Sequence, residues 1–236
     1  MKIEVWSDFV CPFCYIGKRR MEFALEDFPH KEKVSVQYKS YELDPNADKN
    51  PGMNMHELLA KKFGMPIEKA KNMNEDVGKQ AAEVGLTYNF DDMKSTNTFD
   101  AHRVAQYATK HGKGKELTER LLYAYFTESK LISGHETLIE LAKEVGLNPE
   151  EVGNLLQLNK YANKVRDDED QARQIGVQGV PFFVFNEKYA VSGAQPTEVF
   201  KEVLEKVWEE ENKEPTIQSL NPKNSDTTYC TDEGCK

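Results

Sequence analysis

A Cys-Pro-Phe-Cys motif placed directly after a strand pattern constrains the fold of this chain more than any other feature. Residues 2–6 alternate apolar and polar side chains, as a β-strand does, and the motif Cys11–Cys14 follows after a short loop. Pro12 suits the first turn of a helix, and apolar residues recur at helical spacing from Tyr15 to Phe28. Alternation returns from Val34 to Tyr41. This order predicts a strand–helix–strand unit whose two strands are parallel.

The next segment, residues 45–174, predicts a large helical domain inserted after this unit. Its apolar residues recur every three or four positions, and glycines separate the periodic stretches, as they do at the ends of helices. Asn148 followed by Pro149 is typical of a helix start. No fixed repeat occurs along the segment, so a helical solenoid is not expected. The predicted helices cover residues 55–63, 67–84, 99–110, 115–128, 135–145, 149–157 and 161–175.

Strand patterns return in residues 175–211. The continuous apolar run Phe182–Phe185 predicts a strand buried on both faces, and Tyr189–Ser192 follows a tight turn as its hairpin partner. An amphipathic helix ends this segment. With residues 1–44, these elements predict an α/β fold that the helical domain interrupts. The polar residues 212–236 predict a flexible tail.

Charge and hydropathy argue against two classes of protein. The net charge of −9 at pH 7 argues against nucleic-acid binding, which needs clustered Lys and Arg. No apolar run is long enough to span a membrane, and the first residues carry no export signal, so we expect a cytoplasmic protein. Thiols stay reduced in that compartment, and a chain of 236 residues can bury a core without disulfides. Its four cysteines therefore indicate chemistry.

The position of the motif suggests a role for each of its cysteines. Backbone N–H groups and the helix dipole at the first turn stabilise an anion, so Cys11 should ionise more readily than a free cysteine and attack as a thiolate. Cys14 lies one turn later and can resolve the mixed disulfide that forms. Phe13, between them, adds no charge of its own to the thiolate.

A zinc site is the alternative interpretation of the motif. Zinc needs four ligands, and the only other cysteines are Cys230 and Cys235, whose spacing is looser than is usual for a zinc knuckle. We therefore expect no metal.

A proline immediately before an apolar strand is the second informative element. Pro181 cannot sit within a sheet ladder, and Gly179 permits an unusual backbone nearby, so Val180–Pro181 suggests a tight loop. If this peptide bond is cis, the loop can lie beside the Cys11 sulfur and offer the backbone of Val180 to an extended substrate. The alternative is an ordinary trans proline at the start of a strand.

Together, these elements resemble the thioredoxin fold with an inserted helical domain, which is the arrangement of the DsbA family of thiol-disulfide oxidoreductases. The chain resembles the FrnE-like branch in particular, which is related to 2-hydroxychromene-2-carboxylate isomerase and the kappa-class glutathione transferases. The similar blocks extend over almost the whole chain and comprise Asp8–Tyr15, Tyr41–Pro45, Asn97–Thr98, Ala101–Arg103, Gly176–Phe183 and Ser192–Gln195.

The resemblance implies a role for each part of the predicted site. It makes Cys11 the nucleophile, Cys14 the resolving thiol and Pro181 a cis-proline. Periplasmic DsbA proteins usually have histidine where Phe13 stands and begin with an export signal, so strong oxidising power and a periplasmic location are not implied here. The related glutathione-dependent isomerases usually have serine in place of Cys11, which favours thiol-disulfide chemistry for this chain.

The cysteines of the tail are candidates for an auxiliary redox pair. Some FrnE-like proteins carry a C-terminal Cys-x4-Cys, and Cys230 and Cys235 could exchange electrons with Cys11 and Cys14 in the same way. The alternatives are a thiol pair without function and a local disulfide that forms only on oxidation.

Further residues are candidates to line the active site or to move a proton. Pro12, Phe13 and His102 are candidates for the lining, although a histidine in a helix is more often a packed or surface residue. Glu42 and Lys39, at the end of the second strand, could hold the proton of Cys14 if either is buried. Solvated surface charge is the more common fate of such residues.

The sequence thus predicts a protein thiol-disulfide oxidoreductase or isomerase that acts through Cys11 and Cys14. Its substrates would be protein or peptide disulfides, and it would need no organic cofactor, with glutathione or a thioredoxin-type reductant as electron partner. We expect a monomer or homodimer. The alternative enzyme is a glutathione-dependent isomerase or transferase on the same scaffold, and the alternative without catalysis is a metal-binding or holdase module.

Overall fold

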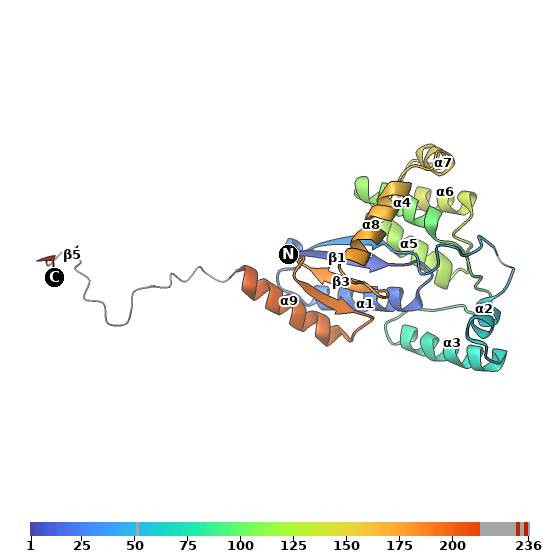
Figure 1. Ribbon diagram of the computed structural model, residues 1–236, viewed down its shortest axis with the longest axis horizontal. Helices are drawn as coiled ribbons and strands as arrows, with labels where there is room; N and C mark the ends of the chain where they lie inside the picture. Colours follow the sequence, from blue (N-terminus) through green and yellow to red (C-terminus); the bar gives the residue numbers. More distant parts are fainter. Residues whose placement is uncertain (51, 213–229, 232–233, 236) are drawn as a thin grey trace.

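A mixed sheet of four strands forms the centre of the fold (Figure 1). β1 (Lys2–Ser7) pairs in parallel with β2 (Ser35–Ser40) and antiparallel with β3 (Phe182–Phe185), and β3 forms a hairpin with β4 (Tyr189–Ser192). The spatial order is β2-β1-β3-β4. The parallel pairing of β1 and β2 confirms the predicted strand–helix–strand unit. This computed structural model describes residues 1–50, 52–212, 230–231 and 234–235.

Two helices from distant parts of the chain cover one face of the sheet. α1 (Pro12–Glu26) and α9 (Thr197–Glu211) contact each other there (Figure 1). Phe183 and Phe200 meet edge to face in the core beneath them, with ring centroids 4.8 Å apart. Burial of this apolar core holds the segment with β1 and α1 against the segment with β3 and α9. Its other buried members include Ile3, Val5, Met21, Phe28, Phe185 and Leu204.

The opposite face of the sheet is covered less completely. α8 (Ala162–Gln174) lies on it, and the indole N–H of Trp6 donates to the backbone oxygen of Asp168 at 2.8 Å. Phe183 and Phe185 are fully buried, but Phe182 and Val184 are only half-buried. The prediction that β3 is buried on both faces is therefore wrong, because α8 shields only part of this side.

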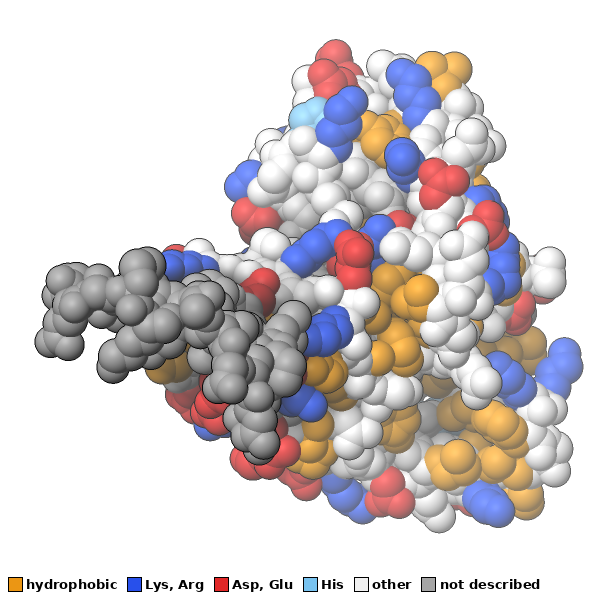
Figure 2. Space-filling view, turned by 60° about the vertical axis from the view of Figure 1, so that its left-hand side comes forward, with side chains coloured by type: hydrophobic (Ala, Val, Ile, Leu, Met, Phe, Trp, Pro, Cys, Tyr) orange, Lys and Arg blue, Asp and Glu red, His pale blue; other side chains and the backbone are white. Residues whose placement is uncertain are grey.

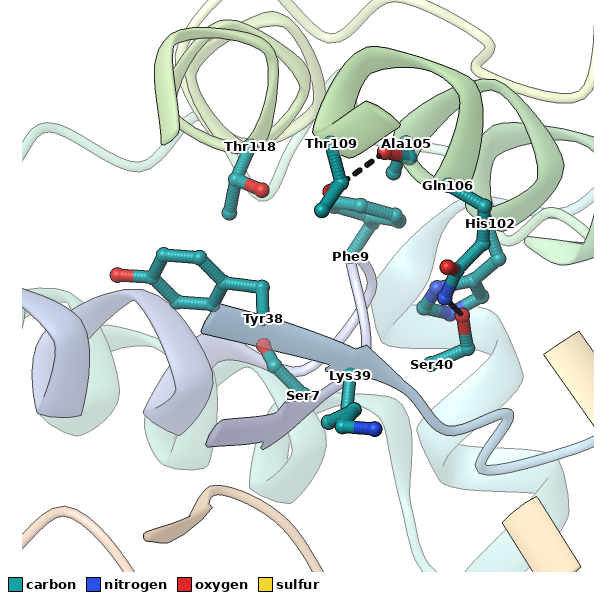
Figure 3. Close-up of a pocket in the computed structure, with 10 residues that line it drawn as sticks. All are labelled: Ser7, Phe9, Tyr38, Lys39, Ser40, His102, Ala105, Gln106, Thr109 and Thr118. Atoms are coloured by element: carbon teal, nitrogen blue, oxygen red, sulfur yellow. Dashed lines mark hydrogen bonds between the residues drawn. The ribbon is translucent and has the colours of Figure 1, made fainter. Parts of the chain in front are cut away.

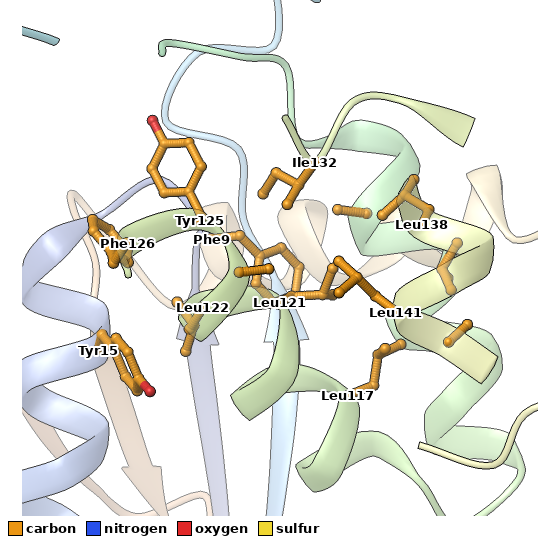
Figure 4. Close-up of a cluster of buried hydrophobic side chains, with 14 of the residues drawn as sticks. Phe9, Tyr15, Leu117, Leu121, Leu122, Tyr125, Phe126, Ile132, Leu138 and Leu141 are labelled. Carbon is orange, nitrogen blue, oxygen red and sulfur yellow. The ribbon is translucent and has the colours of Figure 1, made fainter. Parts of the chain in front are cut away.

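The inserted helices pack around a core that they share with the first unit. Phe9 and Tyr15, at the start of the chain, lie among Leu121, Leu122 and Phe126 in this core (Figure 4). The insertion is therefore continuous with the segment that carries the Cys-Pro-Phe-Cys motif. Its helices before α8 are α2 (Met55–Phe63), α3 (Ile67–Ala82), α4 (Phe99–Lys110), α5 (Gly114–Phe126), α6 (His135–Glu144) and α7 (Pro149–Gln157).

Most helices have the predicted bounds or differ by a few residues at one end. α2, α4 and α7 match the predicted ranges, and Asn54 and Asn148 cap α2 and α7 through their side chains. α1 begins at Pro12, whereas the apolar periodicity predicted Tyr15. The expectation that Pro12 suits the first turn is confirmed, and the periodicity starts later because proline can begin a helix without adding to the apolar face.

The described part of the tail is small. Beyond α9, the structure describes Asn212 and the strands β5 (Cys230–Thr231) and β6 (Gly234–Cys235), which pair antiparallel with Cys230 opposite Cys235. The predicted flexibility of residues 212–236 falls mainly outside the described residues. None of the described helices has both the length and the apolar character that crossing a membrane requires.

The surface carries charges of both signs. On the face shown in Figure 2, basic and acidic side chains are interspersed, with apolar areas exposed between them. The net charge of −9 is therefore not gathered into one acidic patch on this face.

An ionic cluster joins α1 to α5 beside the sheet. Glu119 on α5 accepts hydrogen bonds from Tyr15 at 2.6 Å and from Arg19 at 2.7 Å, and it also pairs with Lys18. Burial opposes ionisation of Glu119, but Lys18, Tyr15 and Arg19 together hold its pKa below the usual value of 4.5. The helix that carries the motif is thus bound to the insertion by charge as well as by apolar packing.

A Glu119→Gln variant is expected to be less stable than wild type at neutral pH. A carboxylate whose pKa is depressed by folding stabilises the fold above its unfolded-state pKa, and this contribution is lost as the pH falls through the folded-state value. The difference in the free energy of unfolding should therefore shrink as the pH falls below 4.5. Urea denaturation at a series of pH values measures it, and a difference independent of pH would contradict the role given to Glu119.

Candidate active site

The turn from β1 into α1 places both thiols of the motif at one end of the sheet. Cys11 is the N-cap of α1, with φ −89° and ψ 112°, and its N–H donates to the backbone oxygen of Asp8 at 3.2 Å. The N–H of Cys14 donates to the oxygen of Cys11 at 3.0 Å. Both thiols are free, and both cysteines are buried. Phe13, between them, is 39% exposed and marks the accessible side of the motif.

The loop before β3 lies against the first thiol. The Val180–Pro181 peptide bond is cis, and the thiol of Cys11 donates to the carbonyl oxygen of Val180 at 3.5 Å. Pairing of β1 with β3 brings these segments together, although they are far apart in the sequence. The backbone of Val180 is thus the group that borders Cys11.

A glycine in α1 permits the close approach of this loop. A Cβ atom on Gly17 would lie 3.0 Å from Pro181 Cγ and 3.3 Å from Phe183 Cζ. Such distances are shorter than ordinary van der Waals contacts, so a side chain here would push the loop away from the helix. Gly17 was not predicted as a site residue, and one glycine within a helical pattern carries no signal of what packs on it.

A Gly17→Ala variant is expected to be less stable than wild type by about 1 kcal/mol. Alanine favours a helix over glycine by about 1 kcal/mol, but overpacking of a filled contact costs about 1–3 kcal/mol. Gly78 in α3 is a matched control, because a Cβ there meets only Phe90 at 4.0 Å. Gly78→Ala should be neutral or stabilising. Chemical denaturation of both variants measures the contrast, and stabilisation of both would contradict the tight contact.

The second thiol is enclosed by protein. The backbone N–H of Asp8 donates to Cys14 Sγ at 3.5 Å. Burial raises the pKa of Cys14 well above its usual value, and the neighbouring Cys11 raises it further, whereas the Ser7 hydroxyl and the Asp8 amide lower it. Cys14 therefore needs help to lose its proton.

A buried carboxylate and a buried imidazole meet next to Cys14. Asp8 Oδ1 lies 3.3 Å from Nε2 of His102 on α4, and Asp8 Oδ2 accepts the N–H of Leu43 at 2.8 Å. His102 was predicted as a lining residue. Asp8 was noted only as part of a similar block, although a charged residue at a strand end directly before Phe9, Val10 and the motif could have marked it.

Tyr88 is another residue of this region that the sequence did not indicate. Its hydroxyl donates to the backbone oxygen of Pro12 at 2.8 Å, which ties the segment after α3 to the motif. Burial is the main cause that raises the pKa of Tyr88, and nearby Cys11 adds to it. A tyrosine in a non-periodic segment gives no sequence signal for such a contact.

Glu42 and Lys39 make contacts with α8 and not with Cys14. Glu42 is buried, and Arg166 of α8 donates to its Oε2 at 2.6 Å, so the expectation of a solvated charge is wrong for Glu42. Lys39 is half-buried and lies 3.1 Å from Asp168. Neither side chain forms a hydrogen bond with Cys14 in the described structure. Packing of α8 against β2 draws both of them toward α8.

The described residues contain no group of three or more His, Cys, Asp and Glu side chains that could hold a metal ion. The side chains of Cys230 and Cys235 lie outside this statement, since only their backbone is described.

Comparison with known proteins identifies the family. A model of DsbA-like thioredoxin domains matches residues 2–205. A probable DsbA oxidoreductase from Streptomyces coelicolor is 39% identical in sequence, with a TM-score of 0.85 over 100% of this chain and 98% of that chain. The YwbO protein of Bacillus subtilis is 26% identical over 86% of this chain and 94% of its own length.

More distant structures share the fold. The cytosolic disulfide reductase DsbM from Pseudomonas aeruginosa has 15% identity and a TM-score of 0.63 over 87% of this chain and 98% of its own. A 2-hydroxychromene-2-carboxylate isomerase has 14% identity and a TM-score of 0.66 over 89% of this chain and 98% of its own. Both likenesses concern the fold alone. The fold is a thioredoxin fold with a helical insertion, as predicted, and the chain belongs to the family of DsbA-like thioredoxin domains.

Proposed function

We propose that this protein catalyses thiol-disulfide exchange on protein or peptide disulfides, with Cys11 as nucleophile and Cys14 as resolving thiol. The observation that carries the proposal is the placement of two free thiols at the N-terminus of α1, with the Val180 carbonyl 3.5 Å from the Cys11 sulfur. The N–H groups of a first helical turn stabilise a thiolate, which is the attacking species in disulfide exchange.

The exchange has two balanced steps. The Cys11 thiolate attacks a substrate disulfide, forms a mixed disulfide, and displaces one substrate sulfur as a thiolate. Cys14 then loses its proton and attacks the Cys11 sulfur, so that the bond between Cys11 and the second substrate sulfur breaks. The substrate disulfide is reduced to two thiols, and the dithiol of the enzyme is oxidised to a disulfide. A thiol reductant such as glutathione, in the cytoplasm, would return the enzyme to its dithiol form.

The loop at Val180 supports an extended substrate. A backbone carbonyl beside the nucleophile can pair with the backbone of a peptide that lies across the site, independently of its side chains. Phe13, which is exposed between the two cysteines, offers a substrate an apolar contact. Protein disulfides of varied sequence are therefore the substrate class that this site suits.

The proposal also gives the two tail cysteines a redox role. In the β5–β6 pair, Cys230 stands opposite Cys235, and opposed residues in antiparallel strands have Cα atoms about 4.5–5.5 Å apart. A disulfide spans such a separation. We infer that this pair cycles between dithiol and disulfide and exchanges electrons with Cys11 and Cys14.

Catalysed reduction of a fluorogenic peptide disulfide tests the main proposal. The full chain with glutathione should reduce the peptide faster than glutathione alone, and it should also recover activity from a scrambled disulfide protein if it isomerises disulfides. Glutathione-dependent isomerisation or transfer to small aromatic ligands, without disulfide exchange and without need of Cys14, would support the alternative enzyme and reject this one.

A further inference from the structure

The inserted helical domain places a histidine close to the two thiols of the motif. His102 on α4 is buried, and it pairs with buried Asp8, whose Oδ1 lies 3.3 Å from Nε2. The backbone N–H of the same Asp8 donates to the Cys14 sulfur at 3.5 Å. Phe9 packs on the imidazole, with ring centroids 4.7 Å apart. One residue thus contacts both the resolving thiol and the histidine.

A small cavity borders His102 and Phe9. It offers about 10 Å³ to the centre of a water molecule, close to the space that one buried water needs. Ser7 and His102 both line it, with Phe9 and Ser40 (Figure 3). Hydrogen bonding by the Ser7 hydroxyl lowers the pKa of the Cys14 thiol and so opposes part of the effect of burial. The Ser7 hydroxyl and the imidazole thus border a space of about the size of one water molecule.

The resolving step needs a base near Cys14. The enclosed thiol must become a thiolate before it can attack the mixed disulfide, and burial opposes that ionisation. Lys39 and Glu42 form no hydrogen bond with Cys14 among the described residues, and they bind Asp168 and Arg166 instead. General base catalysis reaches a proton directly or through one water, and a hydroxyl that both donates and accepts can extend such a path by one further relay.

We propose, on the basis of the proposed disulfide exchange, that His102 accepts the proton of Cys14 through the Ser7 hydroxyl and a water in this cavity. Asp8 orients the imidazole and stabilises the imidazolium that forms. In the resolving step, the Cys14 proton moves to the Ser7–water path while the path passes a proton to His102. The Cys14 thiolate forms a bond to the Cys11 sulfur, and the substrate sulfur leaves with the electron pair of the broken bond. His102 then returns its proton to the substrate thiolate or to water.

Charged and titratable groups from the neighbouring elements face this region. Glu42 is one of them: burial raises its pKa, Arg166 and His102 both act to lower it, and Arg166 pairs with it at 2.6 Å. The remaining groups are Lys39 on β2, which lines the cavity, Tyr125 on α5, which lies near Asp8, and Asp168 on α8, which accepts from Gln106 at 2.5 Å.

The test measures the two steps of exchange separately in the full chain. Reduced protein is mixed with a peptide disulfide, quenched with acid at intervals, and analysed by intact mass for the mixed disulfide. His102→Gln keeps an amide that can bond to Asp8 but cannot accept the proton. Formation of the mixed disulfide should stay within about twofold of wild type, and its resolution should slow by about 100-fold at neutral pH. In the variant, resolution should accelerate about tenfold per pH unit, because hydroxide replaces the missing base.

A second histidine supplies the matched control. His56 is also buried in the insertion and paired with a carboxylate, that of Asp91 at 2.9 Å, but it does not line this cavity. His56→Gln should resolve the mixed disulfide at the wild-type rate. Asp8→Asn is a second probe that keeps the backbone N–H, and it should slow resolution by about tenfold; it serves as the test if His102→Gln does not fold.

Three results would overturn the inference. The first is a rate of resolution within about threefold of wild type in a folded His102→Gln or Asp8→Asn variant. The second is that His56→Gln slows resolution as much as His102→Gln does, and the third is that His102→Gln slows resolution without the expected dependence on pH. If wild type itself forms no mixed disulfide, the proposed function fails together with the inference. Normal mixed-disulfide formation with normal resolution in the variants removes only the role of His102.

Discussion

A Cys11→Ser variant of the full chain is expected to reduce a peptide disulfide no faster than glutathione alone. Serine keeps the size of the side chain and the N-cap of α1, but its hydroxyl does not ionise near neutral pH, and a hydroxyl does not attack a disulfide under these conditions. The rate of peptide reduction should fall by at least about 10³-fold, since Cys11 is the described thiol that contacts Val180 and Cys14 is enclosed. Initial rates by fluorescence measure it.

The matched variant is Cys14→Ser, which should block the second step and leave the first intact. It should accumulate a mixed disulfide between Cys11 and the substrate, visible as a covalent adduct by mass spectrometry under non-reducing conditions. Circular dichroism checks that both variants fold. More than a tenth of wild-type turnover in Cys11→Ser, or an adduct on a cysteine other than Cys11 in Cys14→Ser, would contradict the assignment.

Arg103→Met is expected to lower the free energy of unfolding by about 3–5 kcal/mol. The guanidinium of Arg103 is 2% exposed and binds Asp100 Oδ1 at 2.6 Å. It also donates to the backbone oxygens of Lys160, at 2.9 Å, and of Leu155 and Leu156. Methionine of similar length would leave Asp100 Oδ1 and the Leu156 oxygen without the guanidinium, which costs more than the apolar contact returns, while the Leu155 oxygen keeps the N–H of Lys160.

Arg173→Met is the control for this prediction. Arg173 on α8 is largely exposed and pairs only with Asp170 in the described structure, so its loss should change the free energy of unfolding by less than about 1 kcal/mol. Urea denaturation followed by circular dichroism measures both. Because α4 carries both Arg103 and His102, the first variant should also lose activity at temperatures where wild type stays folded. A loss below about 1 kcal/mol for Arg103→Met would show that water replaces the guanidinium.

Local signals in the sequence were sufficient for most of the fold. The alternation of β1 and β2, the apolar periodicity of the helices, and the Asn148 cap of α7 depend on neighbours within a few residues. The Cys-Pro-Phe-Cys motif and Val180–Pro181 were also recognised from sequence, and the structure brings them to within 3.5 Å at Cys11 Sγ and the Val180 oxygen. Resemblance to the DsbA family supplied the pairing of these two distant segments, which spacing alone does not provide.

The sequence by itself thus determined the elements, their order, and the two thiols that the proposed chemistry uses. The tertiary structure decided which side chains surround these thiols: Asp8 with His102, Tyr88 on the Pro12 carbonyl, and Gly17 beneath Pro181. It also buried Glu42 against Arg166 and left one side of β3 half-covered. The physical reason is that helix and strand formation follows local backbone preferences and apolar periodicity. Contacts between a strand end and an inserted helix instead depend on how whole elements pack.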